Sequence, residues 1–429
     1  MPDPSQANPA TTVRARWCFP VDQPGWENAW LTLCDGRILE RGKGHPGRPH
    51  MDLGDVAIPP GLINPHTHLE FSNLNDPLGM AGTPFPDWVG DVIRWRRGQV
   101  SDPAIARSMK TRAIQTGIAE SYRNGVYAIG EIASPPWKDW QYSHSLLPIR
   151  LFHEFLGLTS ERSEAAWSCL VDQRESMAPP EDSGYQQLQL GVSPHAPYTV
   201  RLEDVARLGG KAAERHQPLA MHLAESPEEM EMIDRGSGAF VDMLSSVDAW
   251  DPNALGSRPS IRAYLEAVFA SPVKQFLVVH GNFLRQEDLD LLQQFKDRAT
   301  VIYCPRTHAY FEHPAYPLQP LLSRGIPVAL GTDSRASNPD LSPWREAQSV
   351  ANKFPEIPGA QILRMATENG ARALMLENGV GTLKTGAPWT GIAVDSRGMS
   401  SNETDPLRFL LQKEDAHPYP VWPLDPGFS

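Results

Sequence analysis

Short apolar runs recur along the chain, and each is followed by a polar or amphipathic stretch long enough for a helix. The run 276–284, FLVVHGNFL, followed by 285–297 is typical. Apolar runs of this length, bounded by turn residues, are expected of buried parallel strands. The runs lie at 57–70, 126–134, 147–157, 188–198, 218–226, 276–284, 300–308 and 327–334. Eight strands alternating with helices predict an α/β fold, a (β/α)8 TIM-like barrel over 58–376.

The two ends of the chain carry a different pattern. Residues 12–42 contain two strand-like runs joined by an Asp35-Gly36 turn signal, and 381–396 adds more strand-like sequence. A sheet that small cannot bury a face unaided. We therefore expect 1–57 and 377–429 to form one small β-sandwich beside the barrel, with a proline-rich extension at its end.

Composition narrows the function classes. The chain has 429 residues and a formal net charge of −12, without a block of basic residues. This charge pattern argues against a nucleic-acid partner or an anionic membrane surface and favours a small-molecule substrate. No apolar run approaches a membrane span, and no signal peptide is visible. The four cysteines show no CxxC spacing, so we expect a cytoplasmic protein and leave a homo-oligomer open.

Polar side chains cluster at the carboxyl ends of the predicted strands, which is the end where barrels place their active sites. In the stretch GLINPHTHLEFS, His66 and His68 are two residues apart and point to the same side of a strand. Each such residue alone could merely be a polar residue at a strand end. Together they predict a metal site. The set is His66, His68, His195, His222, Glu225, His280 and Asp333.

The order of these motifs resembles the amidohydrolase superfamily. HxH is followed by HxxE (His222, Glu225), a lone histidine on the sixth strand and an aspartate on the eighth. Within it the chain is similar to the deaminase and chlorohydrolase (ATZ/TRZ) branch, which includes adenosylhomocysteine, guanine and cytosine deaminases and the triazine hydrolases. The resemblance implies one divalent ion, Zn2+ or alternatively Fe2+, on His66, His68, His222 and Asp333.

The resemblance also implies the roles of the remaining residues. A bound Zn2+ lowers the pKa of water to about 7, so that hydroxide forms at neutral pH. Asp333 and His280 would take the proton and orient the nucleophile, and Glu225 would protonate the ring nitrogen beside the carbon under attack. The binuclear branch of the superfamily has a carboxylated lysine on the fourth strand. LQLGVSPHAPY contains no lysine, which favours a single metal.

Several assignments stay open at this point. His195 matches a substrate-contacting histidine of the adenosylhomocysteine deaminase group, but could instead hydrogen-bond loops. Glu70 and Glu154 are candidates for supporting or ion-pair roles, and His308 and His313 for loop positions. The stretch 236–262 is long enough for an added lid.

Three functions remain in competition. The favoured function is deamination of an aminated nitrogen heterocycle. The second is displacement of chloride or of a cyclic-amide nitrogen at the same metal site. The least favoured is a barrel without catalytic activity.

One further resemblance concerns the substrate. HTHLEFSN with FPDWV downstream is similar to the aminofutalosine deaminases, whose substrate joins an adenine nucleoside to a benzoate. Arg306 would then grip the substrate carboxylate through two parallel hydrogen bonds. The alternative is an ion pair with a nearby acid such as Glu312.

Overall fold

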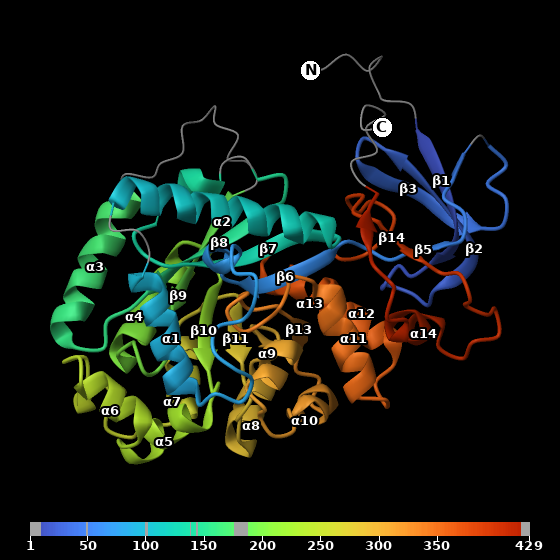
Figure 1. The fold of residues 1–429 in the computed structure, drawn as a ribbon. Coiled ribbons are helices and arrows are strands. Elements are labelled where there is room, and N and C mark those ends of the chain that lie inside the picture. Colours follow the sequence, from blue (N-terminus) through green and yellow to red (C-terminus); the bar gives the residue numbers. More distant parts are fainter. Residues whose placement is uncertain are drawn as a thin grey trace.

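The computed structural model describes residues 10–48, 50–98, 102–137, 139–142, 145–175 and 188–421, with the backbone alone for 139–140 and 171–175. Two units are visible in Figure 1: a large unit of strands surrounded by helices, and a smaller sheet that contains both ends of the described chain.

The large unit is built on an eight-stranded sheet in the order β13-β12-β11-β10-β9-β8-β7-β6, and each neighbouring pair is parallel. The strands are β6 (Leu62–Thr67), β7 (Val126–Ala133), β8 (Ile149–Phe155), β9 (Leu188–Pro194), β10 (Leu219–Leu223), β11 (Phe276–His280), β12 (Ala299–Tyr303) and β13 (Val328–Leu330). The eight predicted strands and the barrel fold are confirmed.

The first and last strands meet at a seam that brings two candidate site residues together. The Asp333 N–H donates to the His66 carbonyl at 3.1 Å. Just below, Asn64 accepts from the Thr332 N–H at 3.1 Å and donates to the Thr332 hydroxyl at 2.8 Å. These hydrogen bonds take the place of a regular β-ladder between β6 and β13, where the barrel closes.

Helices surround the strands, and amphipathic helices among them bury one apolar stripe. In α4, for example, Val205, Leu208 and Ala212 recur at helical spacing and are all fully buried. The barrel helices are α1 (Phe85–Arg97), α2 (Pro103–Arg123), α3 (Ser160–Glu175), α4 (Leu202–Glu214), α5 (Pro227–Arg235), α6 (Ala239–Ser245), α7 (Ile261–Phe269), α8 (Gln286–Gln294), α9 (Pro305–Tyr310), α10 (Leu318–Ser323), α11 (Pro343–Lys353), α12 (Gly359–Ala366) and α13 (Glu368–Ala373). None of the helices in the described ranges is both long and apolar enough to cross a membrane.

The smaller unit is a mixed sheet in the order β15-β14-β5-β1-β2-β3, with β4 paired to β1. The Asp35-Gly36 turn between β2 and β3 has positive φ at both residues, 47° and 71°, as a tight hairpin requires. Strands from both chain ends share this sheet, as predicted. They are β1 (Thr11–Cys18), β2 (Trp26–Cys34), β3 (Arg37–Lys43), β4 (Met51–Asp52), β5 (Val56–Ile58), β14 (Ile392–Asp395) and β15 (Tyr419–Pro420).

Two segments that the sequence left undefined have regular structure. The stretch 236–262 contains α6, a short 3-10 helix (Pro252–Leu255) and the start of α7, and α6 packs against α1. In the C-terminal extension, α14 (Pro406–Gln412) packs on the barrel helices α11 and α12. Residues 422–429 of that extension lie outside the described residues. The exact domain boundaries stay a prediction.

Candidate metal centre

The seam between β6 and β13 places two histidines against one carboxylate. His66 lies near the end of β6 and His68 follows the strand directly, and the Nε2 atoms of both rings are 3.7 Å from Asp333 Oδ1. Asp333 adopts a left-handed backbone, with φ of 56°. A residue with a Cβ adopts this conformation only where its surroundings hold it, which is common at functional sites.

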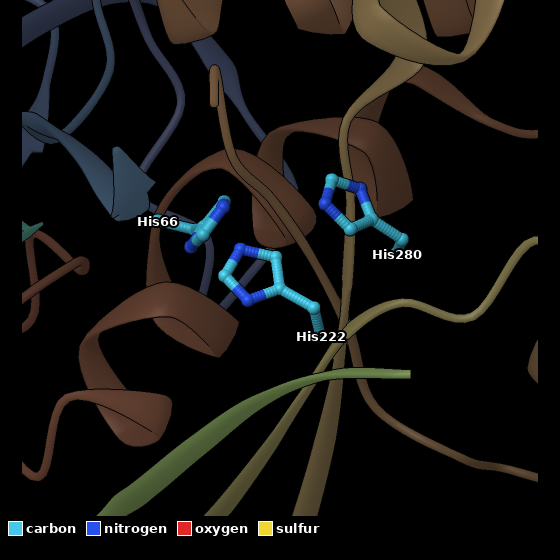
Figure 2. Close-up of side chains that lie close together, drawn as sticks. All are labelled: His66, His222 and His280. Carbon is cyan, nitrogen blue, oxygen red and sulfur yellow. The ribbon is translucent and has the colours of Figure 1, made fainter. Parts of the chain in front are cut away.

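Two further histidines come from the neighbouring strands β10 and β11. The ring of His222 is 4.9 Å from that of His66 and 5.4 Å from that of His280, between centroids. Figure 2 shows the three rings turned toward a common space. Ligand atoms lie within metal-binding reach of one another in two groups that share His66: with His222 and His280, and with His68 and Asp333.

The donor atoms fit a divalent metal ion. Both ring nitrogens of His66 and Nδ1 of His68 are buried and have no hydrogen-bond partner among the described residues. Buried polar atoms are rarely left without a partner in folded proteins, so these atoms fit the binding of a metal ion. Imidazole and carboxylate are the donor types that Zn2+ prefers.

The protonation states suit ligation as well. Burial lowers the pKa of His68 and of His280 to about 3 and that of His222 well below its usual range. These rings are therefore neutral, the form that binds metals. Burial alone would raise the pKa of Asp333, but the surrounding histidines, His66 first, hold it below its ordinary value.

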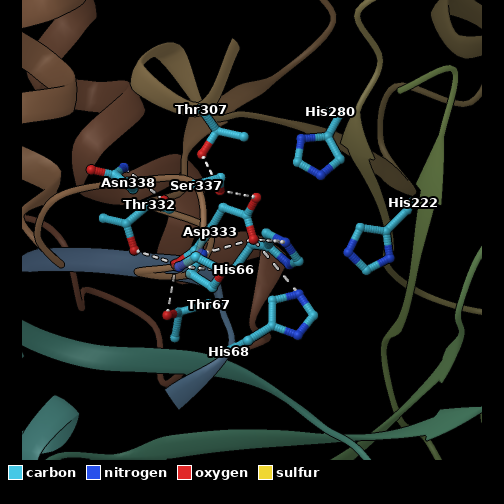
Figure 3. A network of polar contacts seen from close by, with 12 residues as sticks. His66, Thr67, His68, His222, His280, Thr307, Thr332, Asp333, Ser337 and Asn338 are labelled. Atoms are coloured by element: carbon cyan, nitrogen blue, oxygen red, sulfur yellow. Dashed lines mark hydrogen bonds and ion pairs between the residues drawn. The ribbon is translucent and has the colours of Figure 1, made fainter. Parts of the chain in front are cut away.

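Backbone carbonyls and hydroxyls orient the donors. The His195 carbonyl accepts the Nδ1–H of His222 at 3.0 Å, which leaves Nε2 of that ring as the free lone pair. Asp333 Oδ2 accepts from the Ser337 hydroxyl at 3.0 Å, and Ser337 also contacts the Thr307 hydroxyl at 3.0 Å. Figure 3 shows this chain of contacts running from Thr307 to the carboxylate and on to the histidines.

Glu225 lies at the same mouth of the barrel, two residues past β10. Its Oε1 is 3.2 Å from His280 Nε2, and the Tyr198 hydroxyl donates to its Oε2 at 3.5 Å. The side chain is nearly fully buried. Burial, reinforced by the charges of Asp333 and Glu229, raises the pKa of Glu225 well above its usual range. A carboxyl that keeps its proton near neutral pH can act as a general acid.

His195 is next to this centre. Its ring centroid is 4.9 Å from that of His222, its Nδ1 is 2.6 Å from the Thr199 hydroxyl oxygen, and its Nε2 is 3.7 Å from Glu154 Oε1. Glu154 is buried, and its other oxygen accepts from the Ser134 hydroxyl at 2.9 Å. His195 thus contacts both a loop hydroxyl and a buried carboxylate beside the metal centre.

Glu70 is held in an ion-pair network at the edge of the site. Arg96 donates to its Oε1 at 2.6 Å, and the Lys110 ammonium is 3.3 Å from its Oε2. Burial would raise the pKa of this carboxyl, but the two cations lower it to about 2. Of the two roles considered for Glu70, its contacts with Arg96 and Lys110 fit the ion-pair role.

The structure engages Arg306 with acids of its own chain. Its guanidinium donates to both oxygens of Asp340, at 2.6 and 2.9 Å, and lies 3.7 Å from Glu346. The acid in the ion-pair alternative is therefore Asp340, and the expectation of Glu312 was wrong. A contact between Arg306 and a substrate carboxylate stays a prediction, and it requires this pair to open.

Another expectation is corrected at His308. The residue belongs to the helix α9 and is 2% exposed, so it is not a loop residue; His313 follows the helix. Burial lowers the pKa of His308 to about 3. The ring of His308 is 5.9 Å from that of Tyr303 on β12, between centroids, and the sequence PRTHAYFEH gave no sign of this contact.

Sequence reasoning missed three residues that support the site. Ser337, four residues after Asp333, carried no recognisable signal, and neither did Tyr198, because its contact with Glu225 depends on the fold. Glu229 did carry one: Ser226 and Glu229 have the spacing of a helix capping box.

The geometry agrees with what comparison to known proteins finds. The sequence pattern of the Amidohydrolase family matches residues 57–415. The chain belongs to the amidohydrolase family. A 5-methylthioadenosine/S-adenosylhomocysteine deaminase of Pyrococcus furiosus is 29% identical over 369 residues, 81% of this chain and 77% of that protein. An aminodeoxyfutalosine deaminase of Deinococcus radiodurans is 26% identical over 351 residues, 77% of this chain and 78% of that protein.

A solved structure shares the fold across almost the whole length. The crystal structure of Helicobacter pylori aminofutalosine deaminase in complex with methylthio-coformycin superposes with a TM-score of 0.73 at 22% identity, covering 94% of this chain and 95% of that one.

Proposed function

We propose that this amidohydrolase is a deaminase that replaces the exocyclic amino group of an adenine-type nucleoside with oxygen and releases ammonia. The observation that carries the proposal is the position of Glu225, a buried carboxyl whose pKa burial raises, beside four histidines and an aspartate at the mouth of the barrel. The deaminases among the relatives support the same reaction class.

The metal in this proposal is one divalent ion, Zn2+ by the donor set, with Fe2+ as the alternative. His66, His68, His222 and Asp333 would hold it, and when bound it supplies a Lewis acid that lowers the pKa of water to about 7. No lysine occurs on β9, where a second ion would need one. Metal analysis should therefore give about one ion per chain, and two tightly bound ions would reject this assignment.

The roles of the chain's own residues follow from their contacts. Asp333 Oδ1 lies toward His66 and His68 and also accepts the Ser334 N–H at 2.7 Å, while Oδ2 accepts from the Ser337 hydroxyl. The carboxylate held in this way would accept a proton from water. Glu225 gives its proton to the ring nitrogen beside the carbon that water attacks, which makes that carbon electrophilic. His280 contacts Glu225 and orients it. The amino group then takes the proton that Asp333 accepted from water, the carbon–nitrogen bond breaks and ammonia leaves. The remaining hydroxyl proton of the adduct returns to Glu225, so that the new carbonyl forms and both carboxyl groups regain their starting states.

A more specific proposal concerns the identity of the substrate. We propose that His195 contacts the sugar or base of a bound nucleoside, and its position beside His222 supports this role. The aminodeoxyfutalosine deaminase relative supports 6-amino-6-deoxyfutalosine as a candidate beside adenosine, S-adenosylhomocysteine and 5-methylthioadenosine. We propose a small molecule as the only partner needed for turnover; a cytoplasmic location and a homo-oligomer remain predictions.

An ammonia-release screen with metal-loaded protein tests the proposal. Adenine nucleosides should release ammonia, and guanine, cytosine and aminotriazines should release far less. Chloride release from a chlorotriazine, without ammonia from any nucleoside, would favour the chlorohydrolase alternative. No turnover of any compound by protein that holds its metal would overturn the proposal.

A further inference from the structure

The turn that presents Glu225 is held by a second buried glutamate, to which no step of the proposed reaction assigns a role. Glu229 lies in the first turn of α5 and is fully buried. Its Oε1 accepts the N–H of Ala224 at 3.0 Å, and its Oε2 accepts the N–H of Glu225 at 2.6 Å. In return, the Ser226 hydroxyl accepts the N–H of Glu229 at 3.1 Å. The turn and the helix are thus tied by three bonds.

These bonds hold a backbone that would not form unaided. Ala224 has φ of 52°, in the left-handed region that residues with a Cβ rarely adopt. Two consecutive N–H groups point the same way there, and one carboxylate with two oxygens satisfies both. On the other side of the turn, the Asn282 amide donates to the Glu225 carbonyl at 2.8 Å. The backbone of Glu225 is therefore fixed at both its N–H and its C=O.

The arrangement differs from an ordinary helix cap. In a capping box the acid at the third helical position bonds the N–H of the capping residue, here Ser226. Glu229 instead reaches one and two residues further back, to the residues that follow the strand. Its carboxylate has no basic partner among the ion pairs of the described residues, so its position is set by the N–H groups of this turn.

We infer that Glu229 is a positioning residue for the proton donor: by holding the N–H groups of Ala224 and Glu225 it aims the Glu225 carboxyl at the reacting ring. This rests on the proposed function of Glu225. A positioned acid loses rate steeply with small displacements, because the proton must be within hydrogen-bond reach in the transition state.

Glu229→Gln tests the inference. Glutamine has one acceptor oxygen, so one N–H loses its partner and faces an amide donor. We expect kcat to fall about 10- to 100-fold with KM within about twofold and the metal content unchanged. The matched control is Asp288→Asn on α8, which removes another buried capping carboxylate, one that accepts the Arg285 N–H at 2.8 Å. It should lower the melting temperature comparably and leave kcat within about twofold.

A double variant separates positioning from a general loss of stability. If Glu229 acts only through Glu225, adding Glu229→Gln to Glu225→Gln should change kcat by less than about twofold, because the group it aims is already gone. Multiplying effects in the double variant would overturn the inference, and so would a loss of metal with Glu229→Gln or an equal loss of kcat in Asp288→Asn.

Two results keep the inference and the proposed function apart. Wild-type activity in Glu225→Gln alone would sink the proposed function, whatever Glu229→Gln does. Should Glu229→Gln fail to fold, Glu229→Asp keeps the charge with a shorter reach; full wild-type kcat in that variant would overturn the inference.

Discussion

The two ends of the barrel differ in whether their buried polar groups have hydrogen-bond partners. At the amino end, α13 and the residues after it close the interior with apolar side chains such as Leu374, which is fully buried. Arg150 is also buried there, yet its guanidinium finds the carbonyls of Leu374, Leu190 and Met375 at 2.9, 3.1 and 3.3 Å, and the Gln189 side chain as well.

At the carboxyl end the same strands finish in unsatisfied groups and strained backbone. His66 is buried with no hydrogen bond to either ring nitrogen among the described residues, and His280 and Asp333 both have positive φ, 68° and 56°. Burying a polar group without a hydrogen-bond partner lowers the free energy of unfolding. The carboxyl end of the barrel is therefore organised to bind a ligand, and the amino end to stabilise the fold. Substitutions at the two ends should therefore separate activity from stability.

The largest effect is expected at His66. We expect His66→Asn to abolish retention of the metal and all detectable turnover, because this ring belongs to both groups of donors. The metal-free protein should unfold at nearly the wild-type temperature, since the imidazole makes no hydrogen bond that the variant would lose. Calorimetry with and without added Zn2+ checks this: the wild type should gain stability by mass action and the variant should not. A variant that still holds one ion per chain would contradict the assignment.

Next in size is the loss of the proton donor. Glu225→Gln should keep the metal and lower kcat by a factor on the order of a hundred or more, as for a positioned general acid. Metal analysis and steady-state kinetics on the same preparation measure both quantities. Glu231→Gln, on the neighbouring helix with a side chain 41% exposed, is the control and should change neither. Loss of metal along with activity would make Glu225 structural.

The polar residues at the carboxyl end could largely be predicted from the sequence. A strand has a period of two, parallel strands end at one edge, and the barrel order fixes which ends meet, so His66, His68, His222, His280 and Asp333 converge wherever that topology holds. Their individual roles are not fixed by these rules, and the assignments above remain proposals.

The supporting contacts could not be predicted in the same way. The acid that pairs with Arg306 is Asp340, which lies beyond the next strand, whereas Glu312 is near only in sequence. Tyr198 meets Glu225 because the loops after β9 and β10 fold against each other. The position of α13 at the amino end likewise depends on packing. Gly370 of this helix lies so close to β6 that a Cβ added to it would be 2.9 Å from the Cβ of Ile63. No local pattern encodes such distances.

At the amino end the expected effect is on stability alone. Leu374→Ala should lower the free energy of unfolding by about 2–5 kcal/mol, because it opens a cavity in a close-packed interior. The kcat, measured well below the melting temperature, should stay within about twofold of the wild type. Leu39→Ala, at a position that is 50% exposed, controls for the substitution itself. A large loss of kcat in folded Leu374→Ala would mean that the two ends of the barrel are coupled.

Arg306 tests the boundary between the two kinds of region, because it lies near the carboxyl end but is satisfied like Arg150 at the amino end. Its guanidinium is already bound by Asp340, and Glu346 is fully buried beside it. We therefore expect Arg306→Met to destabilise the fold by about 1–3 kcal/mol, the cost of leaving buried charged groups without a partner, and to change kcat/KM equally for adenosine and 6-amino-6-deoxyfutalosine. Arg235→Met, at an arginine 74% exposed, should do neither. A selective loss on the carboxylate-bearing substrate, of the 1.5–3 kcal/mol expected for about one charged hydrogen bond, would instead show that the Asp340 pair opens and that Arg306 grips the substrate.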